Sequence, residues 1–581
     1  MLLRGAARFA HEARVMSLSA TLDGLDAVLG PAVVPGRTAC WDCARRRQIA
    51  NAARPHLLHA LHDSLLETRL PSRERIAPAP AAGMLGHAAA LAAIELLRLG
   101  AAAPLVGKIA VQSLTDLQTT RYTVLPMPAC ALCGGAKSMN DEAIAARVRL
   151  DAARDPAELR GMLAGVVDKR YGIIRDLMVA SQDSPYAVEV PITAVATLGS
   201  YSACAHHDHE HEPEDGSGKG ITVVDAMIGA VGEAVERYSA NYFDPERLVR
   251  APVAAMKGDF LAPERLDLYA ESQYAQPGFP YPRLDPATPI DWTPGRWLDT
   301  GEPVYLPALL TYYGYPAHGA ESFCQVTSNG LAAGPTLEDA SLRALLELVE
   351  RDAFTLTWLL RRPARRVAID DTVDVAVREM NRKLVAEAGA GGRSVAYLLD
   401  VGIRIPVVMS VVFGDGVRWP GASIALSAHL SPRAAIRKAL LEQGQIGPFY
   451  RRLLEEQKPI PERPEDVHTL EDHALYYFPV SRAGAFDFLA AGGVVAAREL
   501  EEPADVSLPA AVARVREAGL RIAVADVTSP DLRGFPFRVV RAIGPDLQQI
   551  HFGHRVPRLG NPRLLAMLGE GTINPDPHPL D

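Results

Sequence analysis

Apolar and polar residues alternate along most of the chain with the periods of helices and strands. Apolar positions recur every three to four residues in four long segments, which predicts helices, and three runs of apolar residues predict strands. Because the two kinds of element are mixed, the sequence predicts an α/β (α+β) domain of more than 400 residues, built from two related halves. The predicted helices are 223–240, 336–360, 377–388 and 432–445, and the predicted strands are 394–399, 406–413 and 422–427.

A smaller α/β unit precedes this domain, with one helix-like segment followed by two strand-like runs. Gly134 and Gly135 begin a polar linker, so we predict a first domain over residues 1–138 and a second over residues 139–581. The other predicted elements are a helix over 81–99, strands over 108–114, 120–125 and 186–198, a helix over 141–168, and surface excursions over 459–509.

The composition is that of a soluble globular protein with a net charge of −9. This net negative charge argues against non-specific binding to nucleic acid, which needs a basic surface. Charged residues interrupt the N-terminal segment, so it lacks the apolar region of a signal peptide, and we expect a cytoplasmic protein. The most apolar stretch, 81–103, contains His87, Glu95 and Arg98, which favours a buried or amphipathic helix over a membrane span.

Four of the six cysteines form two CxxC pairs, Cys40 with Cys43 and Cys130 with Cys133. Each pair can direct two thiolates at one tetrahedral ion, and two pairs complete a four-sulfur site. We therefore predict a structural zinc ion, with a folded segment inserted between the pairs. The alternative is two unrelated pairs of buried thiols. Cys204 and Cys324 are expected to be structural residues.

Two charged segments are interpreted as surface features. Arg45, Arg46 and Arg47 follow the first cysteine pair and are expected to form a solvated face that also offsets the charge of a zinc–thiolate centre. The histidine-rich stretch from His206 to His211 is expected to be a mobile surface loop, and we assign it no metal.

Two predicted helices repeat the same acidic pattern. The segments 225–240 and 339–354 share seven of sixteen positions, including the motif ExxER. Apolar residues surround both segments, so the helices are expected to be buried, and unpaired buried charges are costly. Mg²⁺ with a bound polyphosphate would supply the missing positive charge, and neighbouring arginines could hold phosphate oxygens. The alternative for an isolated ExxER motif is a solvated face with ion pairs along the helix. The motif residues are Glu233, Glu236 and Arg237 in the first segment and Glu347, Glu350 and Arg351 in the second.

Glycine-rich segments precede both acidic helices and are predicted to be loops. Gly218 and Gly220 permit close backbone approach, and Lys219 between them offers a charge to phosphate. Asn329 belongs to the corresponding segment SNGLAAG before the second helix. A third segment, 434–445, fits a relaxed form of the pattern through Glu442 and Gln445.

Together, GKG with ExxER, SNGxAAG with a second ExxER, and a later ALLExxQ closely resemble the YcaO superfamily. More narrowly, the chain resembles its fused cyclodehydratases, which form thiazoline and oxazoline rings in ribosomally made peptides. Residues 30–43 with Cys130 and Cys133 resemble the zinc-bearing end of their partner domain, which is related to ubiquitin-activating enzymes.

The resemblance implies an ATP-dependent reaction. A Cys, Ser or Thr side chain of a precursor peptide attacks the preceding backbone carbonyl, ATP phosphorylates the resulting oxyanion, and loss of phosphate leaves the ring. It also implies site residues: magnesium would be held by Glu233, Glu236, Glu347 and Glu350, and the nucleotide contacted by Lys219, Arg237, Asn329, Arg351, Glu442 and Gln445.

The C-terminus reads PDPHPLD and contains PxPxP, a motif with which related cyclodehydratases end and direct the terminal carboxylate into the active site. Alternating prolines favour a stiff, extended path. The implied catalytic residues are Pro575, Pro577, Pro579 and Asp581, with His578 as a weaker candidate for proton transfer. A disordered terminus is the alternative.

Two departures from the family qualify this picture. Gly229 stands where many members have serine, so one nucleotide or metal contact is expected to be missing. About 29 residues precede the partner-domain resemblance, too few for the usual peptide clamp, so leader binding is assigned to another protein or to a part missing from this chain. Further expected partners are the precursor peptide, a flavin-dependent dehydrogenase and a second copy of the chain. Alternative functions are thioamide or amidine formation, or a non-catalytic scaffold for peptide maturation.

Overall fold

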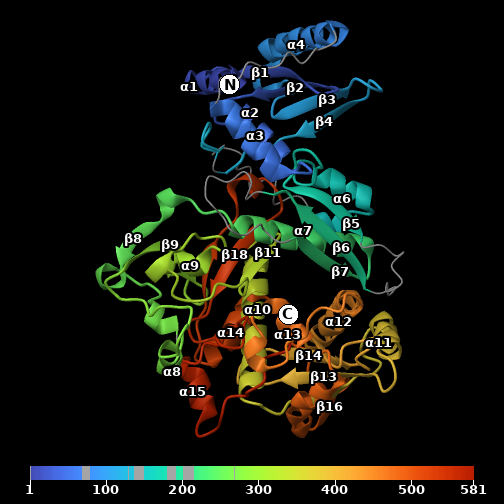
Figure 1. Ribbon diagram of the computed structural model, residues 1–581, viewed down its shortest axis with the longest axis vertical. Helices are drawn as coiled ribbons and strands as arrows, with labels where there is room; N and C mark the ends of the chain where they lie inside the picture. The colour runs from blue at the N-terminus through green and yellow to red at the C-terminus, as the bar shows by residue number, and fades with distance from the viewer. Residues whose placement is uncertain are drawn as a thin grey trace.

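The computed structural model describes residues 2–67, 79–128, 130–135, 149–179, 191–200, 215–266 and 268–580. In this part of the chain, helices combine with four sheets, which confirms the predicted mixed α/β class. The N-terminal unit lies at one end of the molecule, and α7 and α10 lie near the middle (Figure 1). The histidine-rich stretch 206–211, Cys204 and Asp581 fall outside the described residues.

The N-terminal unit is built on an antiparallel sheet with the strand order β1-β2-β3-β4. The long helix α4 (Ala79–Leu99) lies against β1 and β2, and Leu85 and Leu96 are among its buried residues. The predicted helix and both predicted strands of this region are confirmed. The other elements are α1 (Leu2–Glu12), β1 (Ser17–Asp23), β2 (Asp26–Val33), α2 (Trp41–Ala50), α3 (Pro55–Glu67), β3 (Lys108–Ser113) and β4 (Thr119–Thr123).

Helix α4 is more exposed than its composition predicts. Leu91 exposes 67% of its surface and Leu97 exposes 84%, so of the two expected forms, a buried or an amphipathic helix, α4 is not the buried one. Only one face of the helix meets the sheet. By length and composition the segment Ala79–Ala102 could cross a membrane, but a single helix of this kind is a weak indication.

The rest of the chain contains the same unit three times, a strand followed by a capped helix. In each unit a hydroxyl side chain just before the helix accepts a hydrogen bond from the backbone N–H three residues later, which satisfies a free donor of the first turn. The units are β7 (Gly216–Gly220), Thr222 and α7 (Val223–Ala240); β11 (Leu331–Gly334), Thr336 and α10 (Leu337–Leu359); and β15 (Ser423–Ala428), Ser431 and α12 (Pro432–Glu455).

Three further sheets carry these helices, with the strand orders β5-β6-β7, β10-β9-β17-β18-β11 and β15-β14-β13-β12-β16. Helix α7 covers the first of them and also meets β11 and β18, while α10 packs on β11, β18 and β15. Both acidic helices therefore meet at the β11–β18 pair. The strands are β5 (Ile174–Val179), β6 (Ile192–Leu198), β8 (Val249–Pro252), β9 (Pro289–Trp297), β10 (Pro303–Pro307), β12 (Arg365–Ala368), β13 (Arg393–Leu399), β14 (Val407–Phe413), β16 (Val494–Ala496), β17 (Ala523–Asp526) and β18 (Arg538–Ile543).

The segment with Lys219 is a strand, not the predicted loop. A Cβ atom on Gly218 would lie 2.0 Å from the carbonyl oxygen of Ala226, so glycine is what allows β7 to lie directly against α7. A Cβ atom on Gly229 would lie 3.2 Å from the Cα atom of Gly218, so the absence of a side chain at this position suits the same contact. Because successive side chains alternate across a strand, Lys219 points away from α7.

Three predicted segments differ from the structure. Residues 141–148 are outside the described residues, and the rest of the predicted helix 141–168 is interrupted, because Asp155 caps a separate short helix, α6 (Pro156–Met162). Helix α12 continues ten residues beyond the predicted end at 445, through Pro448. Strand β6 confirms the second half of the predicted strand 186–198, whose residues 186–190 lie outside the description.

Residues 459–509 are only partly the surface excursion that their composition predicts. Strand β16 pairs in parallel with β12, and the side chains of Tyr477, Phe486 and Leu489 are buried in the core. The rings of Tyr477 and Phe486 pack edge to face against the neighbouring Trp358, at 85° and 65°. The remaining helices are α8 (Glu271–Tyr274), α9 (Ala308–Thr311), α11 (Val375–Glu387), α13 (Leu470–Leu475), α14 (Leu508–Glu517) and α15 (Pro562–Leu568).

Candidate active site

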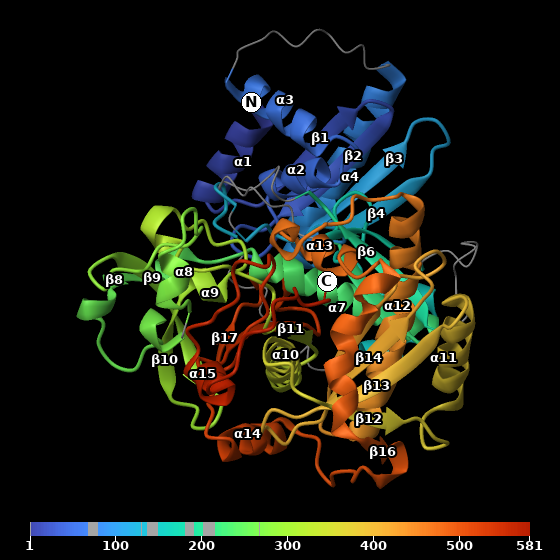
Figure 2. The ribbon, with the colours of Figure 1, turned by 60° about the horizontal axis from the view of Figure 1, so that its bottom comes forward.

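Helices α7 and α10 bring the four predicted metal-binding glutamates into one region. Glu236 lies within electrostatic reach of Glu233 on its own helix and of Glu347 on α10. Glu350 interacts in the same way with Glu347. Both helices lie near the middle of the molecule, where both pack on β11 and β18 (Figure 2).

The nearby arginines do not fully offset the burial of two of these carboxylates, Glu236 and Glu350. Burial raises the pKa of Glu236 to about 8; Arg237 opposes this shift, and the Glu347 and Glu233 carboxylates increase it. Burial also raises the pKa of Glu350 above its ordinary value. Such a group of oxygen donors fits a hard divalent cation, which would make the ionised form of each carboxylate favourable.

The two ExxER arginines pair with glutamates of their own helices. Arg237 lies 2.8 Å from an oxygen of Glu236 and 3.3 Å from one of Glu233. Arg351 lies 3.4 Å from an oxygen of Glu350. The cations proposed to hold the nucleotide thus already lie beside the carboxylates proposed to hold the metal, and each could exchange a carboxylate for a phosphate oxygen.

Helix α12 contributes a third set of charged residues. Lys219 of β7 forms an ion pair with Glu442, and Gln445 lies half-buried three residues later on the same helix. The sequence analysis missed Lys438, one turn before Glu442. Burial and the neighbouring Arg343 lower the pKa of Lys438, and the Glu350 carboxylate acts in the opposite direction.

Donors from two strand segments orient the carboxylates. The backbone N–H of Ser217 donates to Glu233 at 2.8 Å, and its hydroxyl donates at 3.0 Å. The backbone N–H of Ala428, the last residue of β15, donates to Glu350 at 2.7 Å. Ser217 was also missed, because a serine beside glycine gives no signal until the strand is seen to pack on α7.

Asn329 joins the site through Glu347. Its Nδ2 donates to a Glu347 oxygen at 3.4 Å, and its own Oδ1 is buried without a hydrogen-bond partner in the described residues. Arg541 of β18, also missed, is fully buried behind this pair and donates to the carbonyl oxygens of Leu310 and Thr327. Burial lowers the pKa of Arg541 to about 10. An arginine inside an apolar strand, RVVRAI, was the available sequence signal.

The C-terminal tail runs through the protein interior instead of fraying. The Trp358 indole donates to the carbonyl oxygen of Asp576 at 3.0 Å, and the Tyr477 hydroxyl donates to that of Pro577 at 2.5 Å. The alternative of a disordered terminus is therefore wrong for the described part of the tail. Pro575 is exposed, whereas Pro577, His578, Pro579 and Leu580 are buried.

Three histidines hold this tail. The Nε2–H of His578 donates to the carbonyl oxygen of His551 at 2.6 Å, since its Nδ1 accepts from the backbone N–H of Leu580. His473 stacks on His578 with ring centroids 3.8 Å apart, accepts from the backbone of Gly553 and donates to the carbonyl oxygen of His578 at 2.7 Å. Both nitrogens of His578 are occupied, which makes it unsuited to proton transfer.

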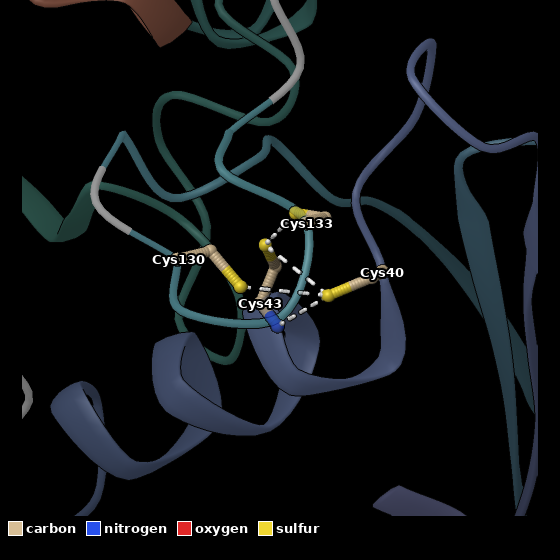
Figure 3. A group of neighbouring side chains, drawn as sticks. All are labelled: Cys40, Cys43, Cys130 and Cys133. Atoms are coloured by element: carbon tan, nitrogen blue, oxygen red, sulfur yellow. Dashed lines mark hydrogen bonds between the residues drawn. The ribbon is translucent and has the colours of Figure 1, made fainter. Parts of the chain in front are cut away.

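The four paired cysteines converge from two segments (Figure 3). Cys40 and Cys43 belong to the start of α2, and all four sulfur atoms lie within 4.8 Å of one another. The Sγ atoms of Cys40 and Cys130 are 3.6 Å apart, as are those of Cys43 and Cys133. Zinc–sulfur bonds of about 2.3 Å give tetrahedral sulfur–sulfur edges of about 3.8 Å. The group therefore fits a tetrahedral metal ion.

The arginines after the first pair are not the predicted solvated face. Arg46 is buried and donates to Asp42 at 2.9 Å, and Arg47 is fully buried. Arg45 alone lies toward the surface, where it donates to Gln48. Hydrogen bonding to Cys130 and Cys133 raises the pKa of Cys43. Thiolates at these positions would therefore need a positive charge close by, and a bound metal ion would provide it.

A sequence model of the YcaO cyclodehydratase family, described as binding ATP and Mg²⁺, matches residues 217–548. An uncharacterized protein of Methanothermobacter thermautotrophicus is 30% identical over 231 residues, 39% of this chain and 56% of that protein. A protein encoded in the tfuA 3′ region of Rhizobium leguminosarum bv. trifolii is 27% identical over 304 residues, 50% of this chain and 69% of that protein. The chain thus spans little more than half of the first of these relatives.

Two solved structures share the fold over the whole chain. A heterocyclase in complex with substrate and cofactor has a TM-score of 0.72 at 24% identity, covering 100% of this chain and 80% of that one. The heterocyclase TruD has a TM-score of 0.66 at 22% identity, covering 100% and 77%. At these identities the likeness shows the fold alone, and the coverage includes the N-terminal unit.

Proposed function

The chain belongs to the YcaO cyclodehydratase family, and on this premise we propose that it is an ATP-dependent peptide cyclodehydratase. Its substrates would be Cys, Ser and Thr residues of a ribosomally made precursor peptide, and its products thiazoline and (methyl)oxazoline rings. The observation that carries the proposal is the meeting of four glutamates from two related helices, each helix also bearing an arginine beside them.

In this proposal Glu233, Glu236, Glu347 and Glu350 hold Mg²⁺. Arg237, Arg351 and Lys219 bind the phosphates, and Asn329, Glu442 and Gln445 complete the nucleotide site. Bound Mg²⁺–ATP supplies the phosphoryl group that turns an amide oxygen, a poor leaving group, into phosphate. Arg237 and Arg351 would each exchange a carboxylate partner for a phosphate oxygen, which costs little charge separation because the metal would take over those carboxylates.

The chain's own groups also shape the peptide end of the reaction. We propose that the tail residues Pro575, Pro577, Pro579 and Asp581 present the terminal carboxylate to the attacking side chain of the precursor. A carboxylate there accepts the proton that a thiol or hydroxyl loses as it attacks the carbonyl carbon. The buried histidines hold the tail in place but take no part in the proton transfer.

We further propose that the four-cysteine group holds zinc. Four thiolates leave no open coordination position, so the ion would stabilise the fold of a first domain, residues 1–138, and not react with substrate. The second domain, 139–581, would hold the reaction site. A separate leader-binding protein, a flavin-dependent dehydrogenase and a second copy of the chain are the partners we expect in the cytoplasm.

Mass spectrometry of a candidate precursor tests the activity directly. Short peptides with Cys, Ser and Thr-rich segments encoded beside this gene are incubated with the protein, Mg²⁺ and ATP. We expect the loss of one water mass per ring, with phosphate released in proportion. Replacement of oxygen by sulfur would indicate thioamide formation instead, and ATP binding without any change in peptide mass would indicate a scaffold.

A further inference from the structure

Arg47 occupies an unusual place for a charged residue. It lies on α2, one helical turn after Cys43, and its side chain is fully buried. Its guanidinium donates to the carbonyl oxygens of Leu125 at 2.7 Å and Pro126 at 3.0 Å, in the segment that leads to the second cysteine pair. A buried guanidinium is tolerated only where its donors are satisfied and its charge is paired.

The paired charge comes from the far end of the chain. The same guanidinium donates to Asp531 at 2.6 Å, across 484 positions of sequence. Asp531 is itself buried and accepts from the Ser529 hydroxyl at 2.5 Å. The oxygen that binds Arg47 also accepts from the hydroxyl of Tyr238 at 2.8 Å. Tyr238 directly follows Arg237 on α7.

Helix geometry places this bond behind the carboxylate site. At about 100° per residue, Tyr238 is roughly 200° around α7 from Glu236, so the two side chains lie on nearly opposite faces. A hydrogen bond at Tyr238 therefore fixes the rotation of the helix without occupying the face that carries Glu236. The bond holds α7 through a charged acceptor, which makes it stronger than a bond between neutral groups.

The second acidic helix has a matching arrangement. Asp352 directly follows Arg351 on α10, is fully buried, and binds Arg563 of α15 through both carboxylate oxygens at 2.6 and 2.5 Å. In each helix the residue after the ExxER motif thus belongs to a buried arginine–carboxylate contact: Asp352 binds Arg563, which is partly exposed, and Tyr238 binds Asp531, which pairs with the buried Arg47. For α10 the arginine comes from the C-terminal region, and for α7 it comes from the cysteine-bearing unit.

We propose that Arg47 and Asp531, through Tyr238, form an anchor that positions α7 for Mg²⁺–nucleotide binding, so that the fold of the cysteine unit sets the affinity of the distant site. This inference rests on the proposed function. Arg47 bonds both the segment before Cys130 and the carboxylate that holds Tyr238. The order that the cysteine group imposes therefore continues, bond by bond, to the back of α7.

Nucleotide binding by the full-length protein tests the anchor. The probe is Mg²⁺ with a non-hydrolysable ATP analogue, titrated by calorimetry into the unaltered protein and into Tyr238→Phe and Arg47→Gln. Tyr238→Phe removes one hydroxyl and keeps the ring, so this variant folds even if Arg47→Gln does not. We expect both to weaken binding by roughly three- to tenfold. The double variant should bind no more weakly than the worse single one, because both act through Asp531.

A matched control separates positioning from general stability. Arg521→Gln removes a different arginine–carboxylate pair, with Asp299 at 3.0 Å, which bonds no residue of α7 in the described chain. We expect this variant to lower the melting temperature and leave the affinity unchanged. Parent-like affinity in Tyr238→Phe and Arg47→Gln would overturn the anchor alone. An unaltered protein that does not bind the analogue at all would overturn the proposed function itself.

Discussion

Helices α7 and α10 carry the same motif but are supported in different ways. Nine of the eighteen residues of α7 are buried, against fifteen of the twenty-three of α10. Behind α7, Tyr238 reaches a carboxylate bound by an arginine of the N-terminal unit. Behind α10, Asp352 binds Arg563, and Trp358 binds the backbone of the C-terminal tail.

This difference shows that one repeated helix can use its two faces for two purposes, one for the proposed binding site and one for contact with the rest of the chain. The faces that meet carry equivalent glutamates and arginines, so they suit one metal–nucleotide complex. The opposite faces connect that complex to two different parts of the chain, the cysteine unit behind α7 and the tail behind α10. Each connection runs through a buried carboxylate, Asp531 behind α7 and Asp352 behind α10, whose hydrogen bonds fix the orientation of the helix.

The strongest challenge to this view is to neutralise one glutamate on each helix. Glu236→Gln and Glu350→Gln keep the side-chain shape and remove a charge from the proposed metal site. Both should lower turnover of peptide and ATP by roughly a thousandfold or more, because a Lewis-acid ion contributes several kcal/mol to the transition state. The measurement is phosphate release with precursor present. If one variant kept the parent rate, only the other helix would hold the metal.

Removing the metal from the cysteine group should have the next largest effect. Cys40→Ser and Cys133→Ser each take one thiolate from the four. Because structural zinc would contribute folding energy directly, the free energy of unfolding of the N-terminal unit should fall by a large part of the roughly 10–16 kcal/mol typical of such a site. Metal analysis of the reduced, unaltered protein should find about one zinc per chain. Cys324→Ser is the control, since Cys324 is buried near Arg558 and apart from this group. A metal-free parent protein would contradict the assignment.

Sequence alone predicted the parts of this comparison that depend on local pattern. The helical period and the repeat gave α7 and α10 nearly to the residue, and the spacing of the cysteines gave the sulfur group. It could not predict that Arg47 is buried, because Asp531 lies 484 positions away and only the tertiary fold brings the two together. Lys219 was predicted on a loop, since nothing local shows that its glycines pack against a helix.

Deleting residues 575–581 tests the connection behind α10. We expect heterocycle formation to fall by roughly a hundredfold, because a proton acceptor held beside the reacting group would be lost. Binding of Mg²⁺–nucleotide should be largely kept. Peptide mass loss and calorimetry measure the two quantities separately.

The deleted segment is partly buried, so its loss also removes core contacts. Deleting residues 579–581 alone is the matched comparison, since it keeps the bonds of Trp358 to Asp576 and of Tyr477 to Pro577. Equal rates of ring formation in the full-length and both shortened proteins would show that the tail has no catalytic part.

Lowering the pH should weaken the contacts between His473 and the C-terminal tail, with a smaller effect than deleting the tail. Burial lowers the pKa of His473 to about 4 in the folded protein, against about 6.5 when unfolded. The unfolded chain therefore binds the proton first, and the stability that neutral His473 provides is complete above about pH 6.5 and is lost as the pH falls toward 4. Burial also lowers the pKa values of the neighbouring His551, His554 and His578, so these groups act in the same direction.

The contribution of His473 can be isolated by comparing the protein with His473→Gln. Between about pH 7.5 and pH 5, the free energy of unfolding should fall by about 2 kcal/mol more in the parent than in the variant. Chemical unfolding at the two pH values measures this difference. His318→Gln is the control, because the side chain of His318 is exposed to solvent. A parallel pH dependence in parent and His473→Gln would mean that the stacked pair of His473 and His578 does not secure the tail.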